Sequence, residues 1–213
     1  MAVLTISRQF GAGGWTLGKA IADRLNYQFV SAGVIDKMAE EANVSAEWIK
    51  SVEKHAGDWL IRFTSKLVSS SFIERHVGET RSDFDEEKYI SFLQNIITKI
   101  ADEDNVVILG RGSQFILQDN PKVIKVLLVA DMKDRINFLN KIWDVSKREA
   151  EKTIQTREKR KDIFLKYFGQ GHAYSLSLYH LIINTSMMNL DQAEDMIVWM
   201  VKDFEKKYSE KTK

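Results

Sequence analysis

The chain has 213 residues, of which 44% are hydrophobic, enough for the core of one domain with an inserted lobe. Its 31 lysines and arginines nearly balance 30 aspartates and glutamates, so the net charge does not indicate a nucleic-acid or membrane-surface protein. The lack of cysteine excludes disulfides, thiolate metal sites and a cysteine nucleophile. No window approaches the roughly 18 consecutive apolar residues of a membrane span, and we expect a cytoplasmic protein.

Short apolar runs alternate with longer segments of helical periodicity along the chain. This alternation predicts an α/β fold with a five-stranded parallel sheet flanked by helices. The predicted strands are Val3–Ser7, Gln28–Ser31, Val106–Gly110, Val123–Ala130 and His180–Thr185.

Two helices have clear apolar stripes. The stripe of the first, which follows the first strand, is predicted to consist of Leu17, Ala20, Ile21, Ala22 and Leu25. The last helix is predicted to begin at Asn189, with Gln192 three residues later completing a cap. Its predicted buried residues are Ala193, Met196, Ile197, Met200, Val201 and Phe204.

The connection between the second and third strands is far longer than one loop and one crossover helix require. We therefore expect a single domain over residues 1–213 in which 43–105 form an inserted helical lobe. A basic segment at 146–171 is a second candidate for a separate moving element.

A glycine-rich turn follows the first predicted strand. In "SRQFGAGGWT" the glycines permit a tight turn, and the following helix adds about half a positive charge at its N-terminus. Such a turn holds phosphate through backbone amides. The amides expected to line it belong to Gly11, Ala12, Gly13, Gly14, Trp15 and Thr16.

The turn departs from the usual phosphate-binding pattern G-x-x-x-x-G-K-S/T. Arg8 stands at the first glycine, Gly14 at the lysine and Trp15 at the hydroxyl position. Thr16, one residue further on, could supply a hydroxyl to a phosphate or to Mg²⁺. The alternatives are a turn that only begins a helix and, less favoured, a dinucleotide site, whose third glycine is replaced by Thr16.

From "ISRQFGAGG" onward the sequence resembles the cytidylate kinase-like family of P-loop kinases. The segments "FVSAGVIDKMAEEA", "VVILGRGSQFIL", "VLLVADMKDRINFL" and "SLYHLIINTS" follow in the family's order, from about Thr5 to Thr185. The resemblance implies a P-loop kinase fold with a monophosphate-side lobe at 43–105 and a lid at 146–171. It implies ATP with Mg²⁺ as donor and a nucleoside monophosphate, CMP or dCMP, as acceptor.

Basic residues near the loop are the candidates for phosphate chemistry, which mainly needs positioning and positive charge. Arg8 ends the first strand and could reach over the phosphates, or it could be a surface arginine or the partner of a nearby carboxylate. The resemblance makes Arg111 of "GRG" a monophosphate-binding arginine. It places Arg135 near the nucleotide base, with a solvated helix face as the alternative.

The predicted lid carries the chain's main concentration of positive charge. Arg157 and Arg160 share one helical face and could clamp phosphate oxygens, although a charged run of this kind also fits a solvated helix face. Family members usually carry an acid three residues before an arginine in this segment. Arg157 stands at the place of that acid, and Glu158 beside it is the available carboxylate.

Two functions remain open at the level of sequence. The first is an ATP-dependent nucleoside monophosphate kinase, with Arg8, Arg111, Arg157 and Arg160 as catalytic residues and Thr16 as the Mg²⁺ ligand. The second is a nucleotide-binding module with little or no transfer activity, acting as a sensor or partner-binding protein. Both have a nucleoside triphosphate and a nucleoside monophosphate as partners, without nucleic acid or membrane, and the sequence indicates no particular oligomeric state.

Overall fold

The computed structural model describes residues 2–35, 86–168 and 176–211. The chain divides into two compact units, Met1–Ala32 with Gln94–Lys213, and Gly33–Leu93. The sheet and the glycine loop belong to the first unit. Residues 43–85 of the lobe predicted at 43–105 lie outside the described residues, and the lobe stays a prediction.

The first unit contains a five-stranded sheet with the strand order β2-β3-β1-β4-β5. All four strand pairs are parallel, which confirms the predicted fold class. Each predicted strand end differs from the observed one by at most one residue. The observed strands are β1 (Val3–Arg8), β2 (Gln28–Val30), β3 (Val106–Leu109), β4 (Val123–Val129) and β5 (Leu181–Asn184).

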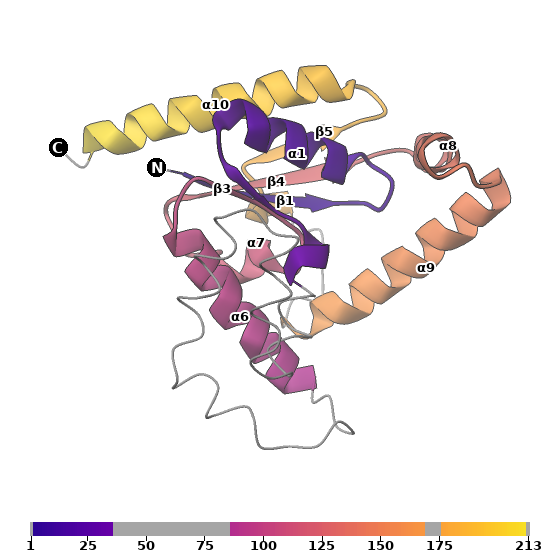
Figure 1. Ribbon diagram of the computed structural model, residues 1–213, viewed down its shortest axis with the longest axis horizontal. Coiled ribbons are helices and arrows are strands. Elements are labelled where there is room, and N and C mark those ends of the chain that lie inside the picture. Colours follow the sequence, from indigo (N-terminus) through magenta and orange to yellow (C-terminus); the bar gives the residue numbers. More distant parts are fainter. Residues whose placement is uncertain (1, 36–85, 169–175, 212–213) are drawn as a thin grey trace, which may run out of the picture. The chain divides into compact units, whose positions relative to one another are not determined.

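Helices cover both faces of this sheet. In Figure 1, α1 (Gly14–Leu25) and α10 (Leu190–Lys211) lie on one face, and the short helix α7 (Ser113–Ile116) lies on the other. The helix α6 (Glu86–Asp102) leads into β3. The core beneath α1 and α10 is built from fully buried aliphatic side chains of the central strands, which explains their nearly continuous apolar runs.

The predicted stripes of the two long helices are largely correct. Leu17, Ile21 and Ala22 of α1 are buried, while Ala20 and Leu25 are only partly buried.

The predicted cap of α10 is confirmed, because the backbone N–H of Gln192 donates to Oδ1 of Asn189 over 2.9 Å. Ala193, Ile197 and Val201 are buried as predicted, whereas Met200 and Phe204 are only partly buried. The prediction for Met196 is wrong, since its side chain is 39% exposed at the edge of the buried stripe.

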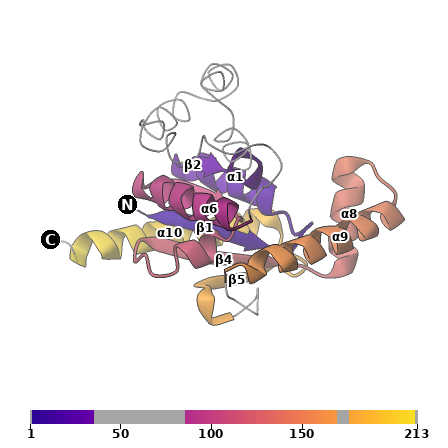
Figure 2. The same ribbon diagram turned by 90° about the horizontal axis from the view of Figure 1, so that it is seen from below.

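Two further helices lie beyond the carboxyl end of β4. The helices α8 (Met132–Trp143) and α9 (Lys147–Lys166) pack on each other around Leu139, Ala150 and Ile154, and Figures 1 and 2 show α9 extending past the carboxyl end of β1. A capping box between Ser146 and Glu149 fixes the start of α9. A single turn of 3-10 helix, Leu176–Leu178, precedes β5. No helix within the described residues is both long and apolar enough to cross a membrane.

Candidate functional site

The glycine loop connects β1 to α1 at the centre of the sheet. Gly11 and Gly13 have φ values of +90° and +78°, a region that side chains rarely occupy. A β-carbon on Gly13 would also lie only 2.8 Å from Cδ2 of Leu190. The N-cap residue Gly13 offers no side-chain hydrogen bond to the first turn, so the amides that begin at Gly14 point toward a site suited to an anion.

Hydrogen bonds to residues just beyond β4 and β5 hold this loop in place. The side-chain Oε1 of Gln9 accepts a hydrogen bond from the backbone N–H of Ala130 over 2.8 Å. The hydroxyl of Thr185 lies 3.3 Å from the carbonyl oxygen of Ala12. Sequence reasoning missed both supports although both residues lie in quoted motifs, because a motif does not show which distant backbone group a side chain contacts.

Arg8 crosses the loop and occupies the space beside two glycines. A β-carbon on Gly14 would lie 3.0 Å from Cγ of Arg8, and one on Gly110 would overlap its Nη1. The arginine side chain therefore runs from the start of α1 toward the end of β3. Arg8 therefore lies at the loop, and its contact with phosphate stays a prediction.

Arg111 lies in a tight turn just after β3. Gly110, Arg111 and Gly112 have φ values of +77°, +57° and +71°, and the ring of Phe168 fills the space where a side chain on Gly112 would lie. The guanidinium carbon of Arg111 is 5.8 Å from the centroid of Phe164, within the range of a cation–π contact. Arg8, Arg111 and the end of α9 thus come together at the carboxyl edge of the sheet.

Arg135 lies directly against the glycine loop. The residue is only 7% exposed, and a β-carbon on Gly11 would be 3.0 Å from the β-carbon of Arg135. The solvated-face alternative for Arg135 is therefore wrong. Its Nε and Nη1 atoms are buried and make no hydrogen bond within the described part of the chain, although Nη1 lies 3.9 Å from Oε1 of Glu158. A buried guanidinium whose N–H donors make no hydrogen bond to the described residues suits an anionic or carbonyl ligand.

Glu158 and Lys161 connect α9 to the loop. The carboxylate of Glu158 accepts a hydrogen bond from the backbone N–H of Phe10 over 2.6 Å, and its second oxygen is 2.5 Å from Nζ of Lys161. Nζ of Lys161 donates to the carbonyl oxygen of Arg8 over 3.3 Å. Burial lowers the pKa of Lys161, and the neighbouring Glu158 opposes this effect.

Sequence reasoning did not single out Lys161. The signal that could have identified it was its spacing from Glu158, which stands three residues earlier. The family resemblance implies an acid and an arginine at this same spacing in the segment. The two residues face the sheet side of α9 together because positions i and i+3 are neighbours on a helix.

The predicted clamp residues Arg157 and Arg160 are both exposed on α9. The guanidinium carbon of Arg157 lies 5.7 Å from the ring centroid of Phe10, so this arginine contacts the glycine loop. The clamp on phosphate stays a prediction. Residues 169–171 of the predicted lid lie outside the described residues.

Trp15 and Thr16 are exposed in the first turn of α1, and Trp15 packs edge to face on Phe29 with 6.1 Å between ring centroids. No group of three or more histidine and carboxylate side chains that could hold a metal ion occurs among the described residues. A Mg²⁺ ion carried on phosphates needs few protein ligands, and the exposed Thr16 hydroxyl as one of them stays a prediction.

A buried polar group lies between β1 and α7. Burial raises the pKa of Tyr179, while hydrogen bonds from Ser7 and Gln114 oppose this rise. The hydroxyl of Ser113 and Oε1 of Gln114 are buried and make no hydrogen bond within the described residues. Ser113 and Gln114 of this group lie two and three residues after Arg111, and sequence reasoning missed the group.

A parallel sheet of this order, a glycine loop between β1 and α1, and a basic helix at the carboxyl edge define the P-loop kinase class of folds. The family model of the cytidylate kinase-like family matches residues 3–187, and the chain belongs to that family.

Two curated relatives are cytidylate kinases, and solved structures have a similar fold. The cytidylate kinase of Ignicoccus hospitalis is 26% identical over 94% of this chain and 99% of its own length. That of Fusobacterium nucleatum is 25% identical over 73% of this chain and 79% of its own. An uncharacterized protein from Eubacterium ventriosum has a similar fold, with a TM-score of 0.63, 21% identity and coverage of 95% of this chain and 98% of its own. A gluconokinase from Sinorhizobium meliloti has a TM-score of 0.51 at 13% identity and covers 97% of each chain.

Proposed function

We propose that the protein transfers a phosphoryl group from ATP to a nucleoside monophosphate, CMP or dCMP. Membership of the cytidylate kinase-like family and the two cytidylate kinase relatives support the acceptor class. The glycine loop with its open helix terminus supports the triphosphate, since backbone amides at such a terminus bind phosphate.

The observation that carries this proposal is the position of Arg8. Its side chain lies against Gly14, where the usual loop has a lysine, and continues to Gly110 beside Arg111. A cation is therefore present at the loop without a lysine in the loop. Phosphoryl transfer depends mainly on such positive charge around the transferred group.

The other candidate site residues would bind different parts of the two substrates, according to their positions. The amides from Gly11 to Thr16 would hold the phosphates of ATP. The buried Arg135, whose Nε and Nη1 make no hydrogen bond to the described residues, would bind another part of the nucleotide. Arg111 would bind the acceptor phosphate. Arg157 and Arg160 would close over the triphosphate from α9.

The ion Mg²⁺ would neutralise charge on the triphosphate when bound, with the Thr16 hydroxyl as a protein ligand. The protein itself supplies positioning: the loop fixes the donor phosphates, while the turn around Arg111 orients the acceptor.

The test is an ADP-release assay with ATP, Mg²⁺ and a panel of CMP, dCMP, UMP, AMP and GMP. We expect turnover with CMP or dCMP to exceed that with the purine monophosphates by at least about tenfold. Preferential turnover of a purine monophosphate would contradict the proposed acceptor.

The second candidate is a catalytically weak or silent nucleotide-binding module, acting as a sensor or partner-binding protein. The observation in its favour is Gly14, which removes a cation beside the β- and γ-phosphates. Binding of ATP without ADP release on any monophosphate of the panel would favour this candidate over the kinase.

A further inference from the structure

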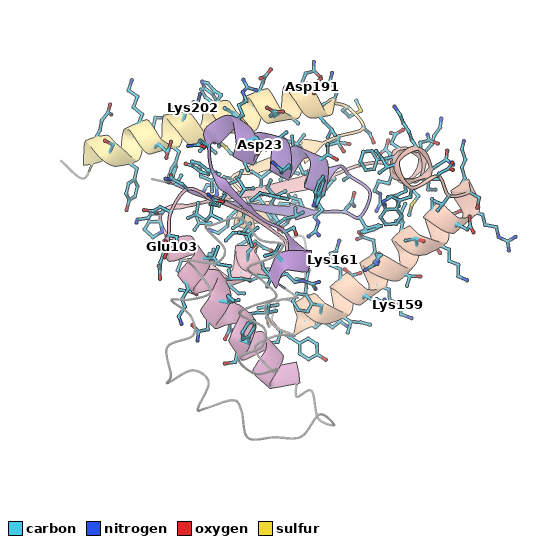
Figure 3. All side chains as sticks on the ribbon, viewed as in Figure 1. Asp23, Glu103, Lys159, Lys161, Asp191 and Lys202 are labelled. Carbon is cyan, nitrogen blue, oxygen red and sulfur yellow. The ribbon has the colours of Figure 1, made fainter. Side chains whose placement is uncertain are left out.

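Lys161 differs from the other basic residues of α9. The rest of them are exposed, whereas the side chain of Lys161 is only 23% exposed and its ammonium group donates to the carbonyl oxygen of Arg8. Figure 3 shows Lys161 on the side of α9 that faces the sheet and Lys159 on the opposite side. The helix thus delivers one ammonium group to the base of the glycine loop.

The ammonium group of Lys161 lies at the residue that begins a loop without its usual lysine. Arg8 occupies the position of the first glycine of a phosphate-binding loop, and Gly14 occupies the position of its lysine. The side chain of Arg8 already fills the space beside Gly14, because even a β-carbon there would lie 3.0 Å from its Cγ. A lysine at position 14 is thereby disfavoured, and a second cation has to come from another element.

Glu158 fixes the direction of Lys161. One carboxylate oxygen accepts the hydrogen bond from the backbone N–H of Phe10, and the other binds the ammonium group of Lys161. The carboxylate is thus held by the loop itself, and Lys161 is held by both the carboxylate and the carbonyl oxygen of Arg8. Two fixed points reduce the freedom that a long lysine side chain would otherwise have.

We propose that Lys161 is the catalytic lysine of this protein, supplied by α9 in place of the lysine absent at position 14. Its ammonium group contacts the β- and γ-phosphates of the bound triphosphate, and Glu158 is its positioning residue. This inference rests on the proposed function, since it requires a triphosphate at the glycine loop. Under this proposal, the positive charge around the transferred phosphoryl group comes from arginines and one lysine, and not from arginines alone.

A purely structural role for Lys161 makes different predictions. A tether between α9 and β1 would affect the stability of the fold and the affinity for every ligand of the loop to a similar degree. A phosphate contact affects ligands according to their phosphate number and affects turnover more than the stability of the fold. The comparison of ATP with AMP separates the two roles, because AMP has no β- or γ-phosphate.

The experiment compares Lys161→Met with the matched control Lys159→Met, which removes an exposed charge two residues away on the same helix. Calorimetric titration gives the affinity for ATP, competition against ATP gives that for AMP, and the ADP-release assay gives turnover. We expect Lys161→Met to lose at least about tenfold in ATP affinity and about a hundredfold in turnover, with AMP affinity within about twofold of the control. Lys161→Arg should recover part of both losses.

Equal losses for ATP and AMP, or an ATP affinity equal to that of Lys159→Met, would overturn the role of Lys161. A failure of the proposed function is distinguishable, since it appears as a wild-type protein that binds ATP but releases no ADP with any monophosphate. In that case the ATP and AMP affinities of the two variants still decide whether Lys161 contacts phosphate.

Discussion

Arg8 and Gly14 exchange the residue types that a phosphate-binding loop usually carries at these two positions. The sequence shows this exchange but does not show where the arginine points. Its direction depends on Gly110, which is about a hundred residues away in sequence and has no side chain to block the guanidinium group. For the same reason the burial of Arg135 was not predictable, since it depends on the contact of its helix with Gly11.

Moving the charge back into the loop tests this exchange. We expect Arg8→Gly to reduce turnover by about a hundredfold, because the transferring phosphoryl group loses a cation. Adding Gly14→Lys to Arg8→Gly should recover at least about tenfold, since the space beside position 14 is then open. The measurement is turnover in the ADP-release assay.

The single variant Gly14→Lys serves as the control, because in it Arg8 still occupies the space that the new side chain needs. A double variant no more active than Arg8→Gly would show that Arg8 does not act through the loop charge.

His180 predicts a pH dependence of stability. Its Nδ1 accepts a hydrogen bond from the backbone N–H of Lys125 over 3.0 Å, which requires the neutral ring. Burial and the charge of Lys125 lower the pKa of His180 below its usual 6.5. The unfolded chain therefore binds more protons just below that pH, and the free energy of unfolding falls as the pH is lowered through this window.

The variant His180→Asn keeps an acceptor oxygen but does not titrate in this window. We expect its free energy of unfolding to vary less between pH 7 and pH 5 than that of the wild type, by up to about 1 kcal/mol, because the residue remains accessible to water. Urea denaturation at both pH values measures the difference. Identical pH dependence in the two proteins would contradict a neutral, hydrogen-bonded His180.

The strands were predictable because buried parallel strands are short, nearly continuous apolar runs. The orientation of α9 was not predictable, because charged residues lie around most of its circumference and only Ala150, Ile154 and Leu165 are buried. The sheet-facing position of Lys161 therefore depends on contacts with Arg8 and Phe10 from a distant segment. The prediction for Met196 failed for a related reason: this exposed residue was assigned to the buried stripe of α10 from its spacing alone.

For the lid, we expect α9 to gain protection from hydrogen exchange when ATP binds. Arg157, Arg160 and Lys161 would then contact phosphate, and the contacts of Glu158 with the loop would be reinforced. Exchange in peptides covering 146–168 should slow by at least about tenfold at the centre of the helix, while α10 serves as the internal control. Unchanged exchange across 146–168 in saturating ATP would remove α9 from the binding site.

For the glycine loop, we expect Gly13→Val to abolish ATP binding. The residue has a φ of +78° and lies against Leu190, so a branched side chain would distort the turn that presents the amides. Calorimetric titration measures binding, and circular dichroism verifies the fold. A folded variant that binds ATP as the wild type does would exclude the loop from the site.

At the scale of the whole molecule, the net charge of +1 does not show where the charged side chains lie. Arg8, Arg111 and Lys161 gather at one edge of the sheet together with the acid Glu158, while the labelled Asp23, Asp191 and Lys202 lie on α1 and α10, away from Lys161 (Figure 3). Binding of a multiply charged anion at this edge should therefore stabilise the folded chain. A composition count alone could not reveal such an edge.

We expect ATP to raise the free energy of unfolding by about 2.7 kcal/mol at a free concentration of 100 times its Kd. Denaturant titrations with and without ATP and Mg²⁺ measure the change. The variant Gly13→Val should show no such increase. A wild-type protein whose unfolding is indifferent to ATP at that concentration would contradict nucleotide binding by the native fold.

The path of Arg8 along Gly14 and Gly110 also has an evolutionary consequence. An arginine in this position disfavours side chains at two sites on different segments, so these three positions are expected to change together as the family diverges. Homologues with glycine at position 8 are free to regain a lysine at position 14 and to accept larger residues at position 110. An alignment in which arginine at position 8 coexists freely with bulky residues at position 110 would contradict this coupled divergence.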